Sequence, residues 1–337
     1  MRDLLKRLCL ADGVSGGEGS IAEIIKQEID GYVQYHTDGM GNIIAFKKGK
    51  NRAKNKLMLD AHTDEVGMII TSVTSDGFLK FETVGSINPS ALLCRKVTIE
   101  GKINGVIGTK PIHLCKGDEK ENPPKEDSLY IDIGAASKEA AMSLVSIGDF
   151  ATFKSDYTLM GDDCVKSKAL DDRIGCAILI TLLKQEAEYD FYATFTVQEE
   201  VGCRGARTAA FAVSPDFAIC LEATTAADIA DLPEDKKVCC LNKGAAVSFM
   251  DRATLYDRSL YNCALNSGIL CQSKKAVAGG NNSGAVHLSK EGIRTLAVSV
   301  PCRYIHSASC LCSFKDIESA LNLAQFMCNK ICSGDIE

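Results

Sequence analysis

Hydrophobic positions at helical spacing come first in the chain and give way to short apolar strands. Residues 1–30 predict helix, and Ser20 with Glu23 forms a capping box that opens an apolar stripe of isoleucines. Short strands follow over residues 42–46 and 56–61. The basic run between these strands has no interleaved aromatic residues, so it predicts a solvated turn rather than a nucleic-acid surface.

Between about residues 66 and 154 the pattern changes to short β-branched and aromatic segments separated by Gly and Asp turns. Segments of this length and composition are typical of a small β-barrel or sandwich. Residues 116–127 are charged and contain Pro123-Pro124, which predicts a loop. The predicted strand segments are 66–73, 78–81, 97–99, 106–107 and 130–133.

From about residue 155 onward, predicted helices and strands alternate. The helices are 171–186, 204–213, 258–269, 284–291 and 314–333, and the strands are 190–198, 217–222, 244–249 and 294–300. Such alternation favours an α/β fold with a mostly parallel sheet and helices on both faces. The strand at 56–61 fits the same sheet. We therefore expect one α/β domain, residues 1–65 and 155–337, interrupted by an inserted β-rich domain over residues 66–154.

The composition is that of an ordinary soluble globular protein, since 46% of the 337 residues are apolar and 24% are charged. The net charge of −6 argues against bulk attraction to nucleic acid or to an acidic membrane. No run approaches the roughly eighteen apolar residues of a membrane span. The first residues also lack the apolar core of a signal peptide. We expect a cytoplasmic protein, in which sixteen scattered cysteines behave as small hydrophobic residues.

Four predicted strands end in side chains that can bind a metal ion or carry protons. These side chains are Asp60, His62 and Asp64; Glu199 and Glu200; Glu222; and His306. A fifth contribution, Asp171-Asp172, lies at the start of the helix over residues 171–186. Because sites in open α/β sheets form at the carboxyl ends of strands, we expect these side chains to lie close together.

Each of these signals taken alone also has a structural explanation. His62 and Asp64 point to one face of an extended strand, where one could bind a metal and the other orient it. They could also be a core histidine and a surface aspartate. Asp171-Asp172 could be stabilised by the helix N-terminus, and Glu199-Glu200 could be an exposed strand end.

Together the residues form a set that is harder to explain as structure. Imidazoles mixed with hard oxygen donors suit zinc, cobalt or manganese. Two histidines and three acids are too many for one catalytic metal with an open position, but they suit two metals that share a carboxylate. The glycine-rich segment 279–284 precedes a helix without Walker or dinucleotide spacing, so it predicts a tight turn near this edge.

Four ordered motifs resemble a known family. They are Asp60-Ala61-His62-Thr63-Asp64-Glu65-Val66-Gly67, Ala169-Leu170-Asp171-Asp172-Arg173, Glu199-Glu200-Val201-Gly202 and Pro301-Cys302-Arg303-Tyr304-Ile305-His306-Ser307. The sequence is similar in these motifs to the TET-type dinuclear metallo-aminopeptidases, which include glutamyl aminopeptidases and proteins once labelled endoglucanase M. The resemblance covers essentially the whole chain.

The resemblance implies a phosphorylase/hydrolase-like catalytic domain with an inserted PDZ-like or barrel domain that helps dimerisation. It implies two divalent metal ions per subunit, one held by His62, Asp171 and Glu222 and the other by Asp171, Glu200 and His306. Asp171 would bridge the metals, Glu199 would be the general base, and Asp64 would orient His62. It also implies a homo-oligomer, with dimers assembling into a dodecamer that admits short or unfolded peptides.

Two positions depart from the family pattern. Many members carry aspartate where this chain has Glu222, whose side chain reaches one carbon further. The glycine-rich loop of the family often contains aspartate where this chain has Asn282, so a negative charge near the expected site is missing.

The expected function is metal-dependent removal of N-terminal residues from short peptides by a two-metal-activated water. A glycoside hydrolase with paired carboxylates is an alternative, but it leaves both histidines idle, and the chain has no Trp for sugar stacking. A metal-dependent deacylase of a small N-acyl metabolite is a second alternative. A non-enzymatic peptide-binding shell predicts the loss of at least one ligand type, yet all are present.

Overall fold

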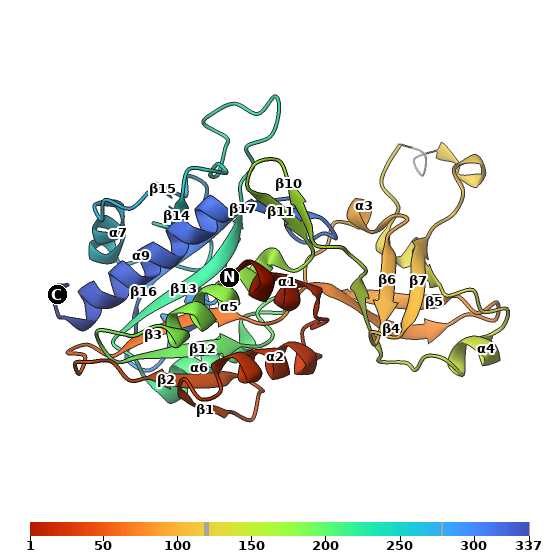
Figure 1. The fold of residues 1–337 in the computed structure, drawn as a ribbon. Helices are drawn as coiled ribbons and strands as arrows, with labels where there is room; N and C mark the ends of the chain where they lie inside the picture. The colour runs from red at the N-terminus through yellow and green to blue at the C-terminus, as the bar shows by residue number, and fades with distance from the viewer. Residues whose placement is uncertain (118–120, 278, 337) are drawn as a thin grey trace.

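The computed structural model describes residues 1–117, 121–277 and 279–336, which form a large α/β body beside a smaller β-barrel (Figure 1). Within these residues the α/β body contains one sheet of eleven strands. The main path of the sheet is β1 (Gln34–Thr37), β2 (Ile43–Lys47), β12 (Phe191–Thr196), β3 (Leu57–His62), β13 (Phe217–Thr225), β16 (Arg294–Arg303), β17 (Cys310–Ser313), β11 (Cys164–Ser167) and β10 (Thr158–Met160). Off this path, β14 (Ala245–Val247) pairs with β16, and β15 (Cys271–Ser273) pairs with β14.

The sheet is mixed, so the prediction of a mostly parallel sheet was wrong. Only the central strands β12, β3, β13 and β16, and the outlying pair β14–β15, run parallel. The flanking pairs β1–β2, β10–β11 and β16–β17 are antiparallel. The reason is connection length, because a parallel crossover needs a dozen or more residues whereas these neighbours are joined by short turns.

Helices cover both faces of the sheet, and alternating strand residues explain why. On β2, Ile43 packs in the same core cluster as α1 (Arg2–Leu10), α2 (Gly19–Ile29), α5 (Leu170–Lys184) and α9 (Phe314–Cys332). Its neighbour Ile44 packs in the opposite cluster, with α6 (Arg204–Val213) and α8 (Ser283–Val286). Successive side chains on a strand point to opposite faces, so each buried strand supplies both cores. The short helix α7 (Arg258–Leu265) joins the first cluster.

The first thirty residues form two helices rather than the single helical segment that was predicted. Helix α1 ends at Leu10 and α2 begins at Gly19, with Glu18 as its N-cap residue, so the capping box from Ser20 to Glu23 is also wrong. A Cβ added at Gly13 would lie 2.6 Å from the guanidinium of Arg173, which is buried behind the segment. Glycine at this position therefore lets the chain pass close to this side chain.

The smaller body is a closed barrel, as the β-rich texture predicted. Its strand order is β4 (Gly67–Val73), β5 (Leu79–Val84), β8 (Tyr130–Asp132), β7 (Ile103–Gly108), β6 (Lys96–Ile99) and β9 (Phe150–Phe153). The barrel has its own apolar core and carries the short helices α3 (Pro89–Leu92) and α4 (Lys138–Met142). The predicted loop 116–127 lies partly outside the described residues, and its end begins a 3-10 turn, η3 (Glu126–Ser128). A second 3-10 turn, η1 (Ile112–Leu114), precedes this loop.

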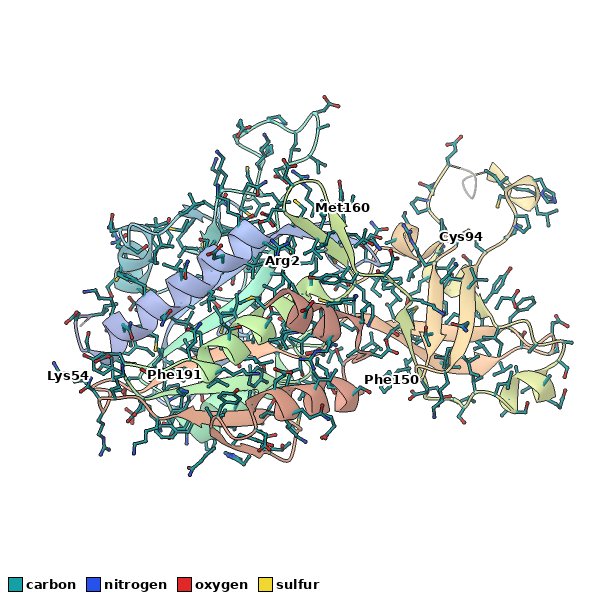
Figure 2. All side chains as sticks on the ribbon, in the orientation of Figure 1. Arg2, Lys54, Cys94, Phe150, Met160 and Phe191 are labelled. Carbon is teal, nitrogen blue, oxygen red and sulfur yellow. The ribbon has the colours of Figure 1, made fainter. Side chains whose placement is uncertain are left out.

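Aromatic packing joins the two bodies near the first helices. Phe150 of β9 lies at the junction (Figure 2), and a Cβ added at Gly17 would lie 2.9 Å from its ring. Only glycine therefore lets the chain approach the barrel so closely. Within the described residues, no helix combines the length and the apolar character needed to cross a bilayer.

Asp257 caps a helix and pairs with an arginine, so its substitution tests this fold. Its Oδ1 accepts hydrogen bonds from the backbone N–H of Ser259 (2.9 Å) and Leu260 (3.0 Å), capping α7, and its Oδ2 accepts one from Arg294 Nε (2.7 Å). Burial acts to raise the pKa of Asp257, but hydrogen bonds from Arg294 and Ser259 outweigh it and lower the pKa to about 2. The folded state is thus stabilised by the ionised carboxylate.

We expect Asp257→Ala to lower the free energy of unfolding at pH 7 by about 1–2 kcal/mol, the usual cost of a lost cap. Because the folded-state pKa is depressed, the difference from wild type is present above about pH 4 and shrinks as the pH falls toward 2. Denaturant unfolding at several pH values measures it. A difference that stays constant down to pH 3 would contradict this account.

Candidate metal centre

The predicted site residues lie at one edge of the sheet, where the four central parallel strands end. His62 is the last residue of β3, and Glu222 lies near the end of β13. Glu199-Glu200 follows β12, and His306 follows β16. Asp171 and Asp172, at the start of α5, reach the same place. The structure therefore brings together residues that are far apart along the chain.

Asp171 stands between two imidazole rings. Its Oδ1 lies 3.2 Å from His62 Nε2, and its Oδ2 lies 3.3 Å from His306 Nε2. A second acid faces each ring: Glu222 Oε2 lies 3.7 Å from His62 Nε2, and Glu200 Oε2 lies 3.4 Å from His306 Nε2. The side chains thus form two clusters that share one carboxylate.

Asp172 belongs to this arrangement although it was not among the expected ligands. Its carboxylate lies within 4.8 Å of ligand atoms of His62 and Glu222, and these three form one candidate metal-binding group. His62, Asp171 and Glu200 form another. The only sequence signal for Asp172 was its place in the Asp-Asp pair, whose second member also suited a helix start.

Divalent cations fit this donor set. Among the described residues, Asp172 Oδ2, Glu200 Oε1 and Glu222 Oε1 are buried oxygens without a hydrogen-bond partner. A buried carboxylate oxygen left unpaired is costly, and a cation is the partner that removes the cost for several acids at once. The mixture of imidazole and carboxylate donors suits zinc, cobalt or manganese.

The pKa values of the acids show the same need for positive charge. Burial is the main influence on Asp172, Glu200 and Glu222, and it raises the pKa of each well above its usual value. Burial also acts to raise the pKa of Asp171, but hydrogen bonds from the two imidazoles outweigh it and hold that pKa below its usual range. The cluster therefore cannot ionise fully without added cations.

Both imidazoles are oriented through their other nitrogen. His62 Nδ1 donates to the backbone oxygen of Asp64 (3.1 Å), and His306 Nδ1 donates to the backbone oxygen of Ser86 (2.8 Å). Because Nδ1 of each ring is bonded to a carbonyl, Nε2 is the nitrogen that faces Asp171 and that could coordinate a cation after losing its proton. Burial acts to lower the pKa of His306, but Asp171 and Glu200 outweigh it and raise the pKa to about 9.

The carboxylate of Asp64 has more contacts than the single role expected for it. It lies 3.4 Å from His62 Nδ1, and it also accepts the backbone N–H of Glu199 (2.9 Å) and of Glu200 (3.1 Å). The Ser15 hydroxyl donates to it as well, at 2.6 Å. Asp64 thus fixes the turn that presents both glutamates, a function that sequence spacing did not indicate.

Several residues beside these side chains have a strained backbone. Five residues without the freedom of glycine adopt positive φ here: Ala169 (55°), Gln198 (56°), Cys203 (54°), Tyr304 (58°) and His306 (58°). Such conformations are costly and persist where the surrounding structure enforces them, often at functional sites.

A cavity of about 470 Å³ opens over the two clusters. Its lining includes His62, Asp171, Glu199, Glu200, Glu222 and His306. Glu199 Oε1 accepts a weak hydrogen bond from Cys203 Sγ (3.5 Å), and burial is the largest influence on its pKa, which it raises. This volume is in the range of small-molecule sites, so the cavity can hold one or two amino-acid residues.

The glycine-rich loop divides into two parts. Gly279, Gly280 and Asn281 line the cavity, which agrees with a turn near the site. Asn282 is fully buried instead, and its Nδ2 donates to Asp60 Oδ2 and Thr196 Oγ1, each at 2.8 Å. Its amide therefore pairs with a buried carboxylate beneath the site, and an aspartate at this position would face Asp60 with a second negative charge.

A buried ion network supports the segment that carries Asp171 and Asp172. Glu65 Oε1 lies 2.6 Å from Lys168 Nζ and 3.5 Å from Arg173 NH2, and all three side chains are buried. Glu65 also accepts the backbone N–H of Gly13 (3.1 Å), and Arg173 NH1 donates to the backbone oxygen of Leu8 (2.8 Å). The network therefore connects the residues on either side of Asp171-Asp172 to Leu8 and Gly13 near the N-terminus.

Comparison with known proteins agrees with this fold and site. The model of the M42 glutamyl aminopeptidase family matches residues 41–323, so the chain belongs to the M42 glutamyl aminopeptidase family. The resemblance seen in the sequence motifs is thereby confirmed. The match supports an aminopeptidase function, that is, a hydrolase that acts on peptide bonds.

Individual relatives match over nearly their whole length. The lysyl aminopeptidase of Pyrococcus furiosus is 30% identical, covering 98% of this chain and 97% of that protein. The structure of a TET aminopeptidase from a marine sediment Thaumarchaeota archaeon is 31% identical, with a TM-score of 0.92, covering 97% of this chain and 95% of that one. A TET1 peptidase of Pyrococcus horikoshii, which can assemble into a tetrahedron or a large octahedral shell, is 32% identical with a TM-score of 0.84, covering 97% and 98%.

We expect Glu65→Gln to lower the free energy of unfolding by about 3–5 kcal/mol, because it leaves the buried Arg173 without its counter-ion and Lys168 with only Asp12, at 3.2 Å. The matched control is Glu186→Gln, which removes the exposed partner of Lys50 and should leave stability unchanged within error. Denaturant unfolding of both variants measures the difference. Equal stabilities of the two variants would refute the importance of the buried network.

Proposed function

We propose that this protein is a dinuclear metal-dependent aminopeptidase that removes N-terminal residues from short peptides. The observation that carries the proposal is the pair of clusters around Asp171, each with one imidazole and at least one further acid, next to Glu199 in one cavity. His62, Asp171 and Glu222 would hold one divalent ion, and Asp171, Glu200 and His306 the other. Asp172 supports the first of these groups.

The ions, with zinc, cobalt and manganese all compatible, would supply Lewis acidity that polarises the scissile carbonyl and makes an attacking water more acidic. Glu199 takes a proton from that water as the new carbon–oxygen bond forms. It returns the proton to the departing nitrogen as the carbon–nitrogen bond breaks. Burial raises the pKa of Glu199, which brings it closer to neutrality and suits both halves of this transfer.

The surrounding residues position these groups. Asp64 holds Glu199 and Glu200 through their backbone N–H groups. The bond from His62 Nδ1 to the Asp64 backbone keeps Nε2 directed at Asp171. The side chains of Asp171, Glu200 and Glu222 are 5–11% exposed, and this burial strengthens the charge interactions among them.

Glu199→Gln separates the base from the metal ligands. We expect this variant to keep its bound metal but to lose about 10²–10⁴-fold in kcat, the usual contribution of a general base. We expect Asp171→Ala to lose metal as well as activity, because it removes the carboxylate shared by both clusters. Elemental analysis beside hydrolysis of amino-acid anilides measures both.

The same assay tests the competing hydrolytic functions. Glycosides and N-acylated amino acids should be hydrolysed far more slowly than peptides with a free N-terminus, and a chelator should abolish peptide hydrolysis. Normal turnover by Glu199→Gln would show that Glu199 is not the general base. Faster hydrolysis of a blocked substrate would favour the deacylase.

We also propose that residues 66–154 form a separate domain that helps dimerisation, and that the chain assembles from dimers into a dodecamer of identical copies. Support comes from the related TET1 peptidase, which can assemble into a tetrahedron or a large octahedral shell. Light scattering after gel filtration should give a mass close to twelve times that of one chain. Removal of residues 67–153 should leave smaller species, whereas a stable monomer of the full chain would contradict the proposal.

A further inference from the structure

Lys274 lines the same cavity as the candidate metal ligands, yet neither the proposed metal centre nor the proposed base uses it. It directly follows β15, and its backbone N–H donates to the backbone oxygen of Val247 on β14 (2.9 Å). This bond continues the pairing of the two strands by one residue. The lysine is thus held on regular structure rather than on a free loop.

The side chain of Lys274 is buried without a partner. Among the described residues, three lysines are buried: Lys47, Lys168 and Lys274, with 9%, 2% and 7% of their surface exposed. Lys47 Nζ donates to a backbone oxygen at 2.6 Å, and Lys168 Nζ pairs with Glu65 at 2.6 Å. With the described residues, the ammonium of Lys274 forms neither a hydrogen bond nor an ion pair. The Nζ of Lys274 is not one of the fully buried atoms that lack a partner, so the ammonium reaches the cavity, where an anion from outside the chain can pair with it.

The surroundings place Lys274 on the cavity wall beside Val238. The next residue, Lys275, donates its backbone N–H to the backbone oxygen of Val238 (2.9 Å). Val238 and Thr225, the last residue of β13, line the cavity together with Lys274.

The charges of the cavity separate into two groups. All its acidic lining residues, namely Asp171, Glu199, Glu200 and Glu222, belong to the proposed metal centre and base. Lys274 is the one lysine or arginine in the described lining. The cavity therefore presents two kinds of group to a substrate: the acids of the proposed metal centre and base, and the ammonium of Lys274.

We propose that Lys274 is a specificity-determining residue that binds a carboxylate of the substrate peptide. The inference rests on the proposed aminopeptidase function and names its substrate class. The carboxylate has two possible sources, the side chain of an N-terminal Asp or Glu, or the C-terminus of a dipeptide. Family membership does not decide which N-terminal residue this chain prefers. The family is described as glutamyl aminopeptidase, but one relative is a lysyl aminopeptidase.

Lys274→Met tests the proposal, because methionine keeps the unbranched apolar stem and removes only the charge. Lys275→Met is the matched control, since Lys275 is the neighbouring residue and its side chain is exposed. The substrates are the p-nitroanilides of glutamate and leucine, and the dipeptide Leu-Gly beside its amide. Both variants are assayed with metal bound, and metal content is measured in each.

If the substrate side chain supplies the carboxylate, Lys274→Met lowers the ratio of kcat/KM for the glutamate anilide to that for the leucine anilide by about 10–100-fold. If the C-terminus supplies it, the ratio for Leu-Gly to its amide falls instead by a similar factor. Lys275→Met changes neither ratio. An equal loss on every substrate, or no loss on any, overturns the proposal.

A binding measurement distinguishes failure of this inference from failure of the proposed function. Calorimetry with free glutamate and glutamine, on metal-loaded protein, reports carboxylate recognition without turnover. If the wild type hydrolyses no peptide, the proposed function fails, and glutamate binding weakened only by Lys274→Met still upholds carboxylate recognition. Hydrolysis by the wild type with identical glutamate and dipeptide recognition in Lys274→Met leaves the function standing and removes the role of the lysine.

Discussion

The burial of several carboxylates in one cavity is the constraint on which the rest of this structure depends. Asp171, Asp172, Glu200 and Glu222 lie around two imidazoles, and three of these acids keep an oxygen with no protein partner among the described residues. Like charges so close together cannot all ionise in a poorly solvated site. The fold must therefore hold the acids in place against their own repulsion.

Two kinds of support meet this demand. Parallel strands deliver His62, Glu199-Glu200 and Glu222 to one edge from separate parts of the chain. Beneath them, the buried ions Glu65, Lys168 and Arg173 fix the segment before α5. Because a buried ion pair costs desolvation and gives little net stability, its value here lies in fixing one arrangement of the aspartates.

Much of the candidate site could be predicted from the sequence because its residues end apolar strands, and strand ends converge by the topology of the fold. The mixed sheet was missed because its antiparallel flanking strands β1, β10, β11 and β17 are only three or four residues long and were not predicted as strands. The break after Leu10 was also missed, although Gly13, Gly16, Gly17 and Gly19 signal it locally in the sequence. The hydrogen bond from His306 to Ser86 could not be predicted from the sequence either. Its acceptor is a backbone carbonyl, which every residue has.

That same backbone contact links the two bodies of the molecule. Ser86 follows the barrel strand β5, yet its carbonyl holds the ring of a histidine that faces the acids of the other body. Displacing the barrel would turn this imidazole away from Asp171 and weaken the grip on a cation. Thermodynamic reciprocity then requires that any cation bound at the candidate centre stiffen the joint between the two bodies.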